Sequence, residues 1–450
     1  MEIANQVKRK NRLLTGCALL VFMGALLFLT GRLGNVFSGK EKVITIGAFS
    51  DSYWEVQNGY SYRILDDAIE KYEAQHPGIR IEYTSGVMKE DYSEWLSEQV
   101  LKGTAPDLFL LPEENLCEFA QADVVEDLTD RMNADASSFY EDRYYTAAVR
   151  SGVYEGAVYA LPFECAPRLM FVNKTILEQE GIDMPLGDWT FDELYRICQR
   201  VTKDSDGDGR LDQFGITGYT YEDAFCGNGV TLFNEKGTEC YFAGERVEES
   251  ISLLERLKDL NQGYSVSEKD FDEGNVVFMP MLFSEYRAYK PYPLSVKKYA
   301  GFEWECLPMP AGSHGENISN LDTLLLAMNK KSRQKKEAFE FMKYLTGDEE
   351  IQSEIFTYSE GVSILRSVTE SEQTLAQLLT DSGSGSFQID TLSRAVEQAA
   401  VYPNFEGYED AMKEVEKAVT DILEGDVNIG TGQIIWNRRI NAFLKGKNIK

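Results

Sequence analysis

Histidine is almost absent from this sequence, which has only His76 and His314 among 450 residues. His76 belongs to a His-Pro-Gly turn and His314 lies in a loop rich in Gly and Ser, so no Ser-His-Asp or Cys-His set can be assembled. The chain also lacks an H-E-x-x-H zinc motif and a Gly-rich phosphate loop. These absences argue against an enzyme. A glycosidase stays open as the enzymatic alternative, because it needs only two carboxylates and the chain has 74 acidic residues.

Positive charge is scarce as well. The 45 Lys and Arg residues leave a formal net charge of −29. Residues 1–31 hold four cations and one acid, so the remainder carries −32. A surface this acidic repels phosphate backbones, which argues against nucleic-acid binding. It favours neutral or cationic ligands over anionic ones.

Paired cysteine motifs are missing, although there are seven cysteines. No C-x-x-C spacing occurs, so a zinc site is not expected. Most of these residues are interpreted as small buried hydrophobic side chains. A bridge between Cys226 and Cys240 is the alternative.

Long apolar runs are limited to the N-terminus, where residues 13–31 contain no charge before Arg32. As a helix, these 19 residues would span roughly 28 Å, close to the thickness of a hydrocarbon core. The basic residues in 1–12 predict a cytoplasmic start, a transmembrane signal anchor at 13–31 and an extracytoplasmic remainder at the cell membrane. No A-x-A cleavage site is evident in 30–38. Leu-Thr-Gly before Cys17 matches a lipoprotein box, but it stands at the start of the apolar run rather than at its end, so an uncleaved anchor is favoured over lipidation.

After residue 42, strand and helix patterns alternate. Residues 42–49, 79–83 and 107–111 are apolar and strand-like, whereas 61–75 and 91–102 carry apolar residues at helical spacing. Strands that alternate with helices over short connections predict an α/β domain, in which helices cover both faces of a parallel sheet.

Six stretches occur in the order found in one known family. They are 69–83 (IEKYEAQHPGIRIEY), 103–111 (GTAPDLFLL), 158–218, 308–310 (PMP), 324–345 (LLLAMNKKSRQKKEAFEFMKYL) and 361–366. In them the chain resembles the family 1 extracellular solute-binding proteins, which include maltodextrin- and oligosaccharide-binding components of ABC importers. The N-terminus departs from this pattern, because Gram-positive members usually carry a well-placed lipoprotein box.

The resemblance implies an α/β, two-lobed periplasmic-binding-protein fold of type II-like topology, with a hinge and an interlobe cleft. Lobe one would comprise residues 42–155 and 276–330, and lobe two 156–275 and 331–450. Lobe closure would capture a sugar or oligosaccharide and deliver it to the permease subunits of an ABC transporter. The alternatives are a membrane-anchored ligand sensor and a binder of peptides, amino sugars or polyamines.

Residues 204–215 resemble a calcium-binding loop. Asp occupies positions 1, 3, 5 and 9 and Gly position 6, which is the spacing of an EF-hand-like loop. Position 12 is Gly215 rather than the usual bidentate Glu. The expected ligands of a structural Ca²⁺ are Asp204, Asp206, Asp208, Arg210 (at the backbone-carbonyl position) and Asp212. The alternative is a solvated acidic turn without metal.

A sugar site needs flat apolar faces for the C–H side of the ring and fixed polar groups for the hydroxyls. We looked for both after predicted strands, at the expected lobe junction, and in later segments where the family places cleft aromatics. The candidates are Asp51, Trp54, Glu113, Glu114, Glu164, Arg168, Phe225, Phe283, Tyr286 and Trp304. For each aromatic residue, packing in the core is the alternative.

Overall fold

The computed structural model describes residues 41–54, 62–84, 86–135, 143–288, 302–381, 385–386, 388–403, 405–425 and 427–447. The basic segment 1–12, the apolar run 13–31 and Cys17 lie outside these ranges, and the prediction of a transmembrane anchor lies there with them. In the described ranges, no helix combines the length and apolarity needed to cross a membrane.

The first lobe is built on a mixed sheet. Its strands lie in the order β2 (Ile79–Thr84), β1 (Lys42–Gly47), β3 (Leu108–Pro112), β10 (Leu321–Met328) and β6 (Ala160–Asn173). β1 is parallel to β2 and β3, and β10 runs antiparallel to β3 and β6. All five residues of β3 are buried, as expected for a strand that is covered on both faces.

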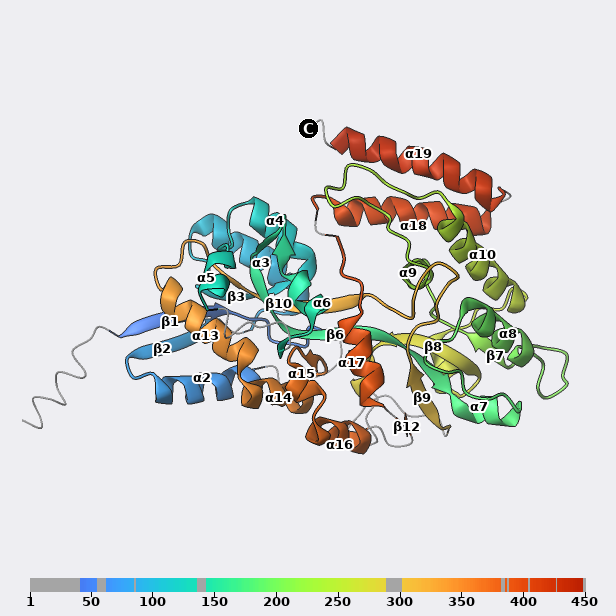
Figure 1. Ribbon diagram of the computed structural model, residues 1–450, viewed down its shortest axis with the longest axis horizontal. Coiled ribbons are helices and arrows are strands. Elements are labelled where there is room, and N and C mark those ends of the chain that lie inside the picture. The colour runs from blue at the N-terminus through green and yellow to red at the C-terminus, as the bar shows by residue number, and fades with distance from the viewer. Residues whose placement is uncertain are drawn as a thin grey trace, which may run out of the picture.

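Helices cover this sheet on both sides (Figure 1). They are α2 (Arg63–Gln75), α3 (Lys89–Lys102), α4 (Leu116–Gln121), α5 (Thr129–Ala134), α6 (Thr146–Ser151), α13 (Lys335–Gly347) and α14 (Glu349–Tyr358), with the 3-10 turn η1 (Glu113–Asn115) after β3 and the small hairpin β4 (Val153–Tyr154) and β5 (Ala157–Val158). α3 ends at Gly103, which adopts φ +70°, a left-handed conformation that Gly enters without steric cost. The core includes Ile44, Phe109, Leu325 and Phe341.

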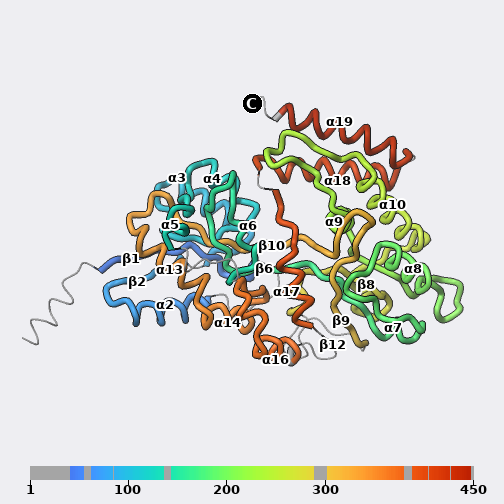
Figure 2. The backbone as a smooth tube through the Cα atoms, viewed as in Figure 1, coloured from blue at the N-terminus to red at the C-terminus, as the bar shows by residue number. Residues whose placement is uncertain are grey.

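Strand β6 belongs to both lobes. Its first half, from Ala160 to Pro167, pairs with β10. Its second half, from Arg168 to Asn173, pairs with β8 (Val276–Leu282) and β9 (Trp304–Leu307). Figure 2 shows this strand running from one lobe into the other. A continuous strand shared by two sheets is therefore one of the connections about which the lobes can move.

The second lobe is built on the sheet order β7 (Phe214–Ile216), β8, β6, β9 and β12 (Gly385–Ser386). The helices of this lobe are α7 (Lys174–Gln179), α8 (Phe191–Val201), α9 (Tyr221–Gly227), α10 (Glu245–Leu260), α11 (Glu268–Asp272), α18 (Tyr408–Glu424) and α19 (Ile429–Lys447). α18 and α19 lie together over the upper side of this lobe in Figure 1. α9 begins with a reciprocal cap, because Thr220 and Asp223 satisfy each other's backbone amides.

A third group of elements fills the junction below β6. It comprises α12 (Phe283–Ala288), β11 (Val362–Ser363), α15 (Arg366–Thr369), α16 (Glu372–Asp381) and α17 (Ile389–Glu397). Leu365 and Leu392 pack there against Leu169 and Phe171 of β6. From α17 the chain rises between the lobes to reach α18 (Figure 2).

The predicted lobe boundaries need correction in two places. β8 and β9 both fall within residues 276–330, the range predicted for lobe one, but both pair with the second half of β6 in the lobe-two sheet. Residues 331–358 were assigned to lobe two, but Ala338, Phe341 and Ile355 lie in the core of lobe one. The short connection after β10 explains the second case, since α13 folds back directly onto the sheet that β10 belongs to.

The six described cysteines are free, and five of them are buried. Cys226 and Cys240 therefore form no bridge. The interpretation of the cysteines as small buried side chains is confirmed for the described ranges.

Candidate functional site

Three acidic residues and a tyrosine meet at one edge of the lobe-one sheet. Glu113 and Glu114 directly follow β3, and Asp322 is the second residue of β10. Because β10 is antiparallel to β3, with Leu324 opposite Pro112, the start of β10 lies beside the end of β3. Tyr53 follows β1 at the same edge. Polar side chains at the carboxyl ends of parallel strands are where ligands bind in open α/β sheets.

Hydrogen bonds fix this arrangement. The amide of Thr323 donates to Glu113 Oε2 at 3.1 Å. The hydroxyl of Tyr53 donates to the carbonyl of the same threonine at 3.4 Å. The Lys89 ammonium lies 4.9 Å from the centroid of the Tyr53 ring, and the Lys89 amide donates to Asp51 at 2.6 Å. A tyrosine face, a cation and several acceptors are thus held in fixed positions.

Burial and mutual repulsion perturb these acids. Burial, and then the charge of Asp322, raise the pKa of Glu113 well above its usual range. The pKa of Asp322 is raised to about 6, chiefly by burial; Arg168 opposes this rise, and the charges of Glu114 and Glu222 add to it. Burial, followed by the charges of Glu114 and Glu113, raises the pKa of Tyr53. Perturbed groups that cluster in this way mark functional-site candidates.

Lobe two contributes the loop after β7 and the first turn of α9. Arg168, from the shared strand, donates from Nε to Asp223 Oδ1 at 2.8 Å and from Nη2 to the carbonyl of Gly218 at 3.2 Å. These contacts hold the β7–α9 loop against β6. Glu222 stands next to Asp223, and burial followed by the Asp223 charge raises its pKa.

Tyr402 connects the two sets of acids. The segment that carries it is fixed beside β10, because Ala400 accepts from the Leu321 amide at 3.2 Å and donates to Ser319 at 2.9 Å. Burial raises the pKa of Tyr402, and the next contributions come from Asp322 of lobe one and Glu222 of lobe two. Charges from both lobes therefore act on one tyrosine. Tyr408, at the start of α18, is affected by Glu222 and Glu113 in the same way.

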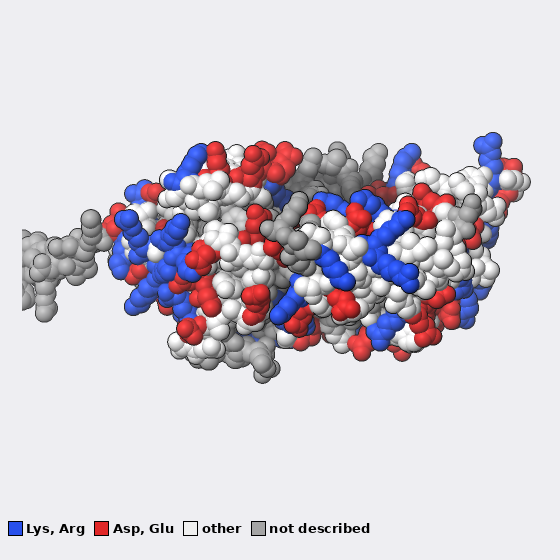
Figure 3. Space-filling model, turned by 90° about the horizontal axis from the view of Figure 1, so that it is seen from above, with Lys and Arg blue, Asp and Glu red and all other residues white. Residues whose placement is uncertain are grey.

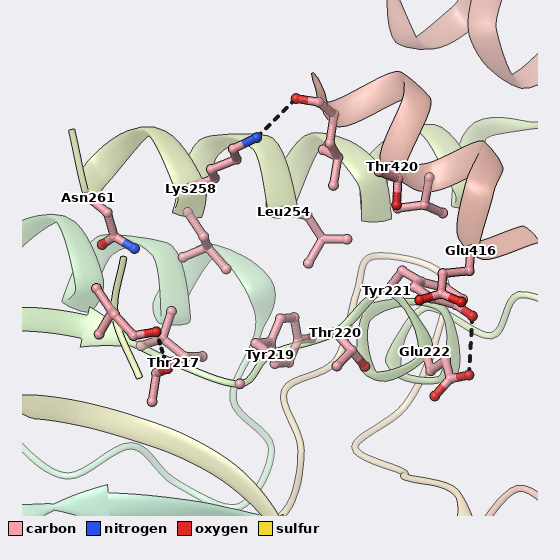
Figure 4. Close-up of a pocket in the computed structure, with 16 residues that line it drawn as sticks. Thr217, Tyr219, Thr220, Tyr221, Glu222, Leu254, Lys258, Asn261, Glu416 and Thr420 are labelled. Carbon is pink, nitrogen blue, oxygen red and sulfur yellow. Dashed lines mark hydrogen bonds between the residues drawn. The ribbon is translucent and has the colours of Figure 1, made fainter. Parts of the chain in front are cut away.

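A cavity of about 630 Å³ opens in lobe two between the β7–α9 loop, α10 and α18. Its lining includes the apolar residues Leu254, Leu257 and Val419 together with several polar side chains (Figure 4). Among these, Lys258 donates to the carbonyl of Leu423 at 3.3 Å. Tyr221 donates to Glu222 Oε1 at 3.3 Å, and both residues line the cavity. Glu222 is also one of the acids between the lobes, which we call the interlobe acids: Glu113, Glu114, Asp322 and Glu222. A cavity of this size lies within the range of small-molecule sites.

Glu164 and Trp54 lie deeper, at the lobe junction. Glu164 Oε2 accepts from the Ser359 hydroxyl at 2.5 Å, and burial raises the Glu164 pKa to about 7. A Cβ at Gly361 would lie 2.3 Å from Glu164 Oε2 and 2.9 Å from Trp54 Nε1. Only glycine fits there. These two predicted site residues are therefore buried support for the junction rather than exposed ligand contacts.

Of the ten predicted ligand-binding residues, four belong to the region of the interlobe acids. Glu113 and Glu114 are two of these acids, and Asp51 and Arg168 are the other two predicted residues found there. The four later aromatics are corrected, because each is nearly fully buried in a core: Phe225 in lobe two, and Phe283, Tyr286 and Trp304 below β6. Trp304, for example, packs at 4.8 Å against Tyr286. All four are large apolar side chains on strands or short helices, and they pack inside these two cores.

Sequence reasoning missed four residues that contribute to the site: Asp322, Glu222, Tyr402 and Tyr408. Asp322 had a detectable signal, since it starts an apolar strand that was recognised, and an acid at that position stands out. Glu222 follows β7 by a short loop and could have been found in the same way. Tyr402 had no such signal, because its segment is neither helix nor strand, and Tyr408 had none because it is simply the first residue of a helix, α18.

The acidic loop of lobe two brings three carboxylates together. One oxygen from each of Asp204, Asp206 and Asp208 lies within 4.8 Å of the others. The Asp204 carboxylate also accepts from the amides of Gly209 at 2.7 Å and Gly207 at 2.6 Å, and these amides lower its pKa.

The rest of the loop fits a calcium ion less well. Asp212 is turned toward Ser205, from which its oxygens accept at 2.7 and 2.9 Å. Gly215, at position 12, is buried in β7 and offers no carboxylate. The residues present therefore supply a partial oxygen shell, in which Arg210 could add only its backbone carbonyl.

Comparison with known proteins identifies the family. The profile of the bacterial extracellular solute-binding proteins matches residues 58–352. The chain belongs to this family. Membership confirms the predicted class, a solute-binding protein rather than an enzyme, and agrees with an extracytoplasmic location.

One curated relative is the maltotriose-binding protein of Pyrococcus abyssi, which is 24% identical over 147 residues. That match covers 33% of this chain and only 29% of the relative. It therefore supports the family without defining a ligand.

Solved structures of other solute-binding proteins share the fold over nearly their whole length. The sugar-binding protein MalE of Xanthomonas citri superimposes with a TM-score of 0.73 at 16% identity, covering 90% of this chain and 98% of that one. A cyclic α-maltosyl-1,6-maltose binding protein of Arthrobacter globiformis gives 0.71 at 17% identity, with 90% and 99% coverage. A cyclo/maltodextrin-binding protein complexed with maltotetraose gives 0.70 at 15% identity, with 91% and 98% coverage. The predicted α/β two-lobed fold is thus confirmed.

Proposed function

We propose that this solute-binding protein captures a neutral sugar or oligosaccharide between its lobes and delivers it to an ABC importer. The observation that carries the proposal is that the charges of Asp322 from lobe one and Glu222 from lobe two both act on Tyr402, after burial, to raise its pKa. A ligand held there would contact both lobes, so its binding would favour the closed arrangement.

The chemistry of this region suits a carbohydrate. Carboxylates accept hydrogen bonds from hydroxyl groups, and such charge-assisted bonds are stronger than neutral ones. Tyr402 and Tyr408 would provide ring faces for the C–H side of a pyranose. The adjoining cavity of about 630 Å³ offers room for further sugar units. Two of the similar proteins bind maltotriose and maltotetraose, which makes α-linked glucose oligomers the first candidates.

Two further parts of the proposal concern the surroundings of the protein. The apolar run 13–31 would hold the N-terminus in the cell membrane as a single-pass anchor, with the lobes outside. Permease subunits of the importer would then receive the ligand at the membrane surface.

A structural Ca²⁺ at the acidic loop belongs to the proposal as well. Asp204, Asp206 and Asp208 would supply carboxylate oxygens, and bound Ca²⁺ would offset their mutual repulsion. Water would have to complete the shell, which predicts weak binding.

A second candidate ligand class is cationic, such as a polyamine or an amino sugar. The excess of acids favours it, because the charges of Glu114 and Glu222 both act on Asp322, where Arg168 and Lys89 oppose them. The two ligand classes differ in net charge, so testing a neutral and a cationic ligand distinguishes them.

The test is thermal unfolding of the purified full chain against panels of oligosaccharides and of polyamines. A ligand at about 100 times its dissociation constant adds roughly 2.7 kcal/mol to the free energy of unfolding, which raises the melting temperature by a few degrees. A shift with glycans, and no product by chromatography, supports the proposal. A shift with polyamines alone would make a cationic ligand, rather than a sugar, the proposed ligand class. The appearance of product would reopen the glycosidase alternative.

A further inference from the structure

One end of lobe one is strongly basic although the protein is acidic. Residues 329–336 read NKKSRQKK and hold five cations in a chain of net charge −29. Lys330, Lys331, Arg333 and Lys336 are exposed. Figure 3 shows Lys and Arg gathered at the end of the molecule where β1 begins. We call Lys42 and these five cations the basic end.

Three of these cations are not neutralised. Lys335 pairs with Glu126 at 2.6 Å, Lys42 pairs with Glu337 at 2.5 Å, and Lys330 pairs with Asp123. Across the described ranges, no ion pair involves Lys331, Arg333 or Lys336. The basic end therefore keeps a local positive field that an anionic surface would complement.

The basic end also lies where the chain enters the fold. β10 ends at Met328, opposite the start of β3, and β1 is parallel to β3. The pair between Lys42 and Glu337 joins the first residue of β1 to the first turn of α13. Ten residues, 32–41, separate Lys42 from the apolar run. At roughly 3.4 Å per step, the eleven steps from residue 31 to Lys42 span at most ~37 Å. If that run is in the membrane, the basic end is within reach of its surface.

An exposed apolar side chain lies on α3, whose following loop contacts the basic segment. Leu101, near the end of α3, is 87% exposed. The loop after α3 is bound to the basic segment, because Asn329 Nδ2 donates to the carbonyls of Ala105 at 3.1 Å and Pro106 at 3.0 Å. Cations together with an exposed leucine are the composition of a surface that binds lipid headgroups and acyl boundaries.

We propose that the basic end docks on anionic phospholipid headgroups of the membrane that holds the N-terminus. Docking would fix the orientation of lobe one, and lobe two would stay free to close about β6. The inference goes beyond solute binding and rests on the proposed anchoring only for the nearness of the membrane.

Hydrogen exchange of the full chain tests the proposal. The chain is combined with vesicles of phosphatidylcholine alone or with vesicles that also contain phosphatidylglycerol. Slower exchange of residues 329–336 is expected only with phosphatidylglycerol, and high salt should abolish it. Each Lys or Arg near an anionic surface contributes about 1 kcal/mol, roughly fivefold. The variant Lys331→Glu/Arg333→Glu/Lys336→Glu should therefore weaken docking at least 100-fold and remove the protection.

The matched control reverses three exposed cations on the other lobe, in Arg438→Glu/Arg439→Glu/Lys445→Glu on α19. It should keep the protection. Both variants should keep the wild-type melting temperature and its shift with ligand, which separates this inference from the solute-binding proposal. Equal exchange of residues 329–336 in the two lipid mixtures would overturn the proposal, whether or not the apolar run 13–31 inserts into the vesicles. Loss of protection in the α19 variant instead would show that the other lobe faces the membrane.

Discussion

Arg168 Nε lies 2.8 Å from Asp223 Oδ1, and this pair joins the strand shared by both lobes to the first turn of α9. Asp223 is buried and also caps α9 through Thr220. The pair thus holds the loop that presents Glu222 and Tyr221 to the interlobe region. The lobe-two half of the site depends on it.

Replacing Arg168 with Gln should lower the free energy of unfolding by about 2 kcal/mol. Breaking a buried pair costs about 3–5 kcal/mol, and the partial exposure of Arg168 reduces that figure. Urea unfolding measures the change. Arg196→Gln is the matched control, since its contact with Glu193 is long and exposed. Equal midpoints for the two variants would show that the pair with Asp223 contributes nothing.

Glu164 should make stability depend on pH. Its pKa is raised from 4.5 to about 7 by burial, so the folded protein holds this proton more tightly than the unfolded chain does. The free energy of unfolding should therefore fall by about 3 kcal/mol as pH rises from about 4.5 to about 7, and Glu164 should add no further loss above that. Denaturant unfolding across this range checks it. Glu164→Gln should remove this part of the pH dependence, and an unchanged profile would refute the assignment.

Asp322 should link ligand binding to proton release. Its pKa is raised to about 6, and a sugar hydroxyl that donates to it would stabilise the charged form and lower that pKa. Affinity for a neutral sugar should then strengthen as pH rises through about 6, with protons released. Calorimetry in buffers of different ionisation enthalpy measures the release. Asp322→Asn should abolish it, whereas release that persists in this variant would assign the proton to another group.

The acidic loop should respond to calcium. Added Ca²⁺ should raise the melting temperature, and a chelator should reverse the rise, because three carboxylates gather within 4.8 Å. Asp206→Asn/Asp208→Asn should lose the response, and Asp188→Asn, an exposed acid of the same lobe, should keep it. A melting temperature indifferent to both calcium and chelator would leave the loop as a solvated turn.

Local patterns predicted the elements well and the lobes less well. The strands at 42–49, 79–83 and 107–111 match β1, β2 and β3 because buried strands are read directly from continuous apolar runs. The assignment of β8 failed because which sheet a strand joins is decided by pairing between residues far apart in sequence, such as Phe171 with Met279. Periodicity carries no information on such pairing.

Site residues were predicted correctly where they directly follow a recognisable strand. Glu113 and Glu114 were found because they follow an unmistakable strand. Trp304 and Phe283 were misassigned, since an aromatic residue in a core and one in a cleft have the same local sequence signature. Tyr402 could not have been found, because the influence of Asp322 and Glu222 on it depends on a crossing segment that only the tertiary structure reveals.

The most direct test of the account is a calorimetric titration of the glycan that best stabilises the full chain. The wild type should bind one equivalent without converting it. Asp322→Asn and Glu222→Gln, one from each lobe, should each weaken binding about tenfold or more, the loss expected when a charged hydrogen bond worth roughly 1.5–3 kcal/mol is removed. Glu98→Gln, on an exposed face of α3, should bind as the wild type does. Wild-type affinity in both site variants, or no glycan that binds at all, would contradict capture of a sugar between the lobes.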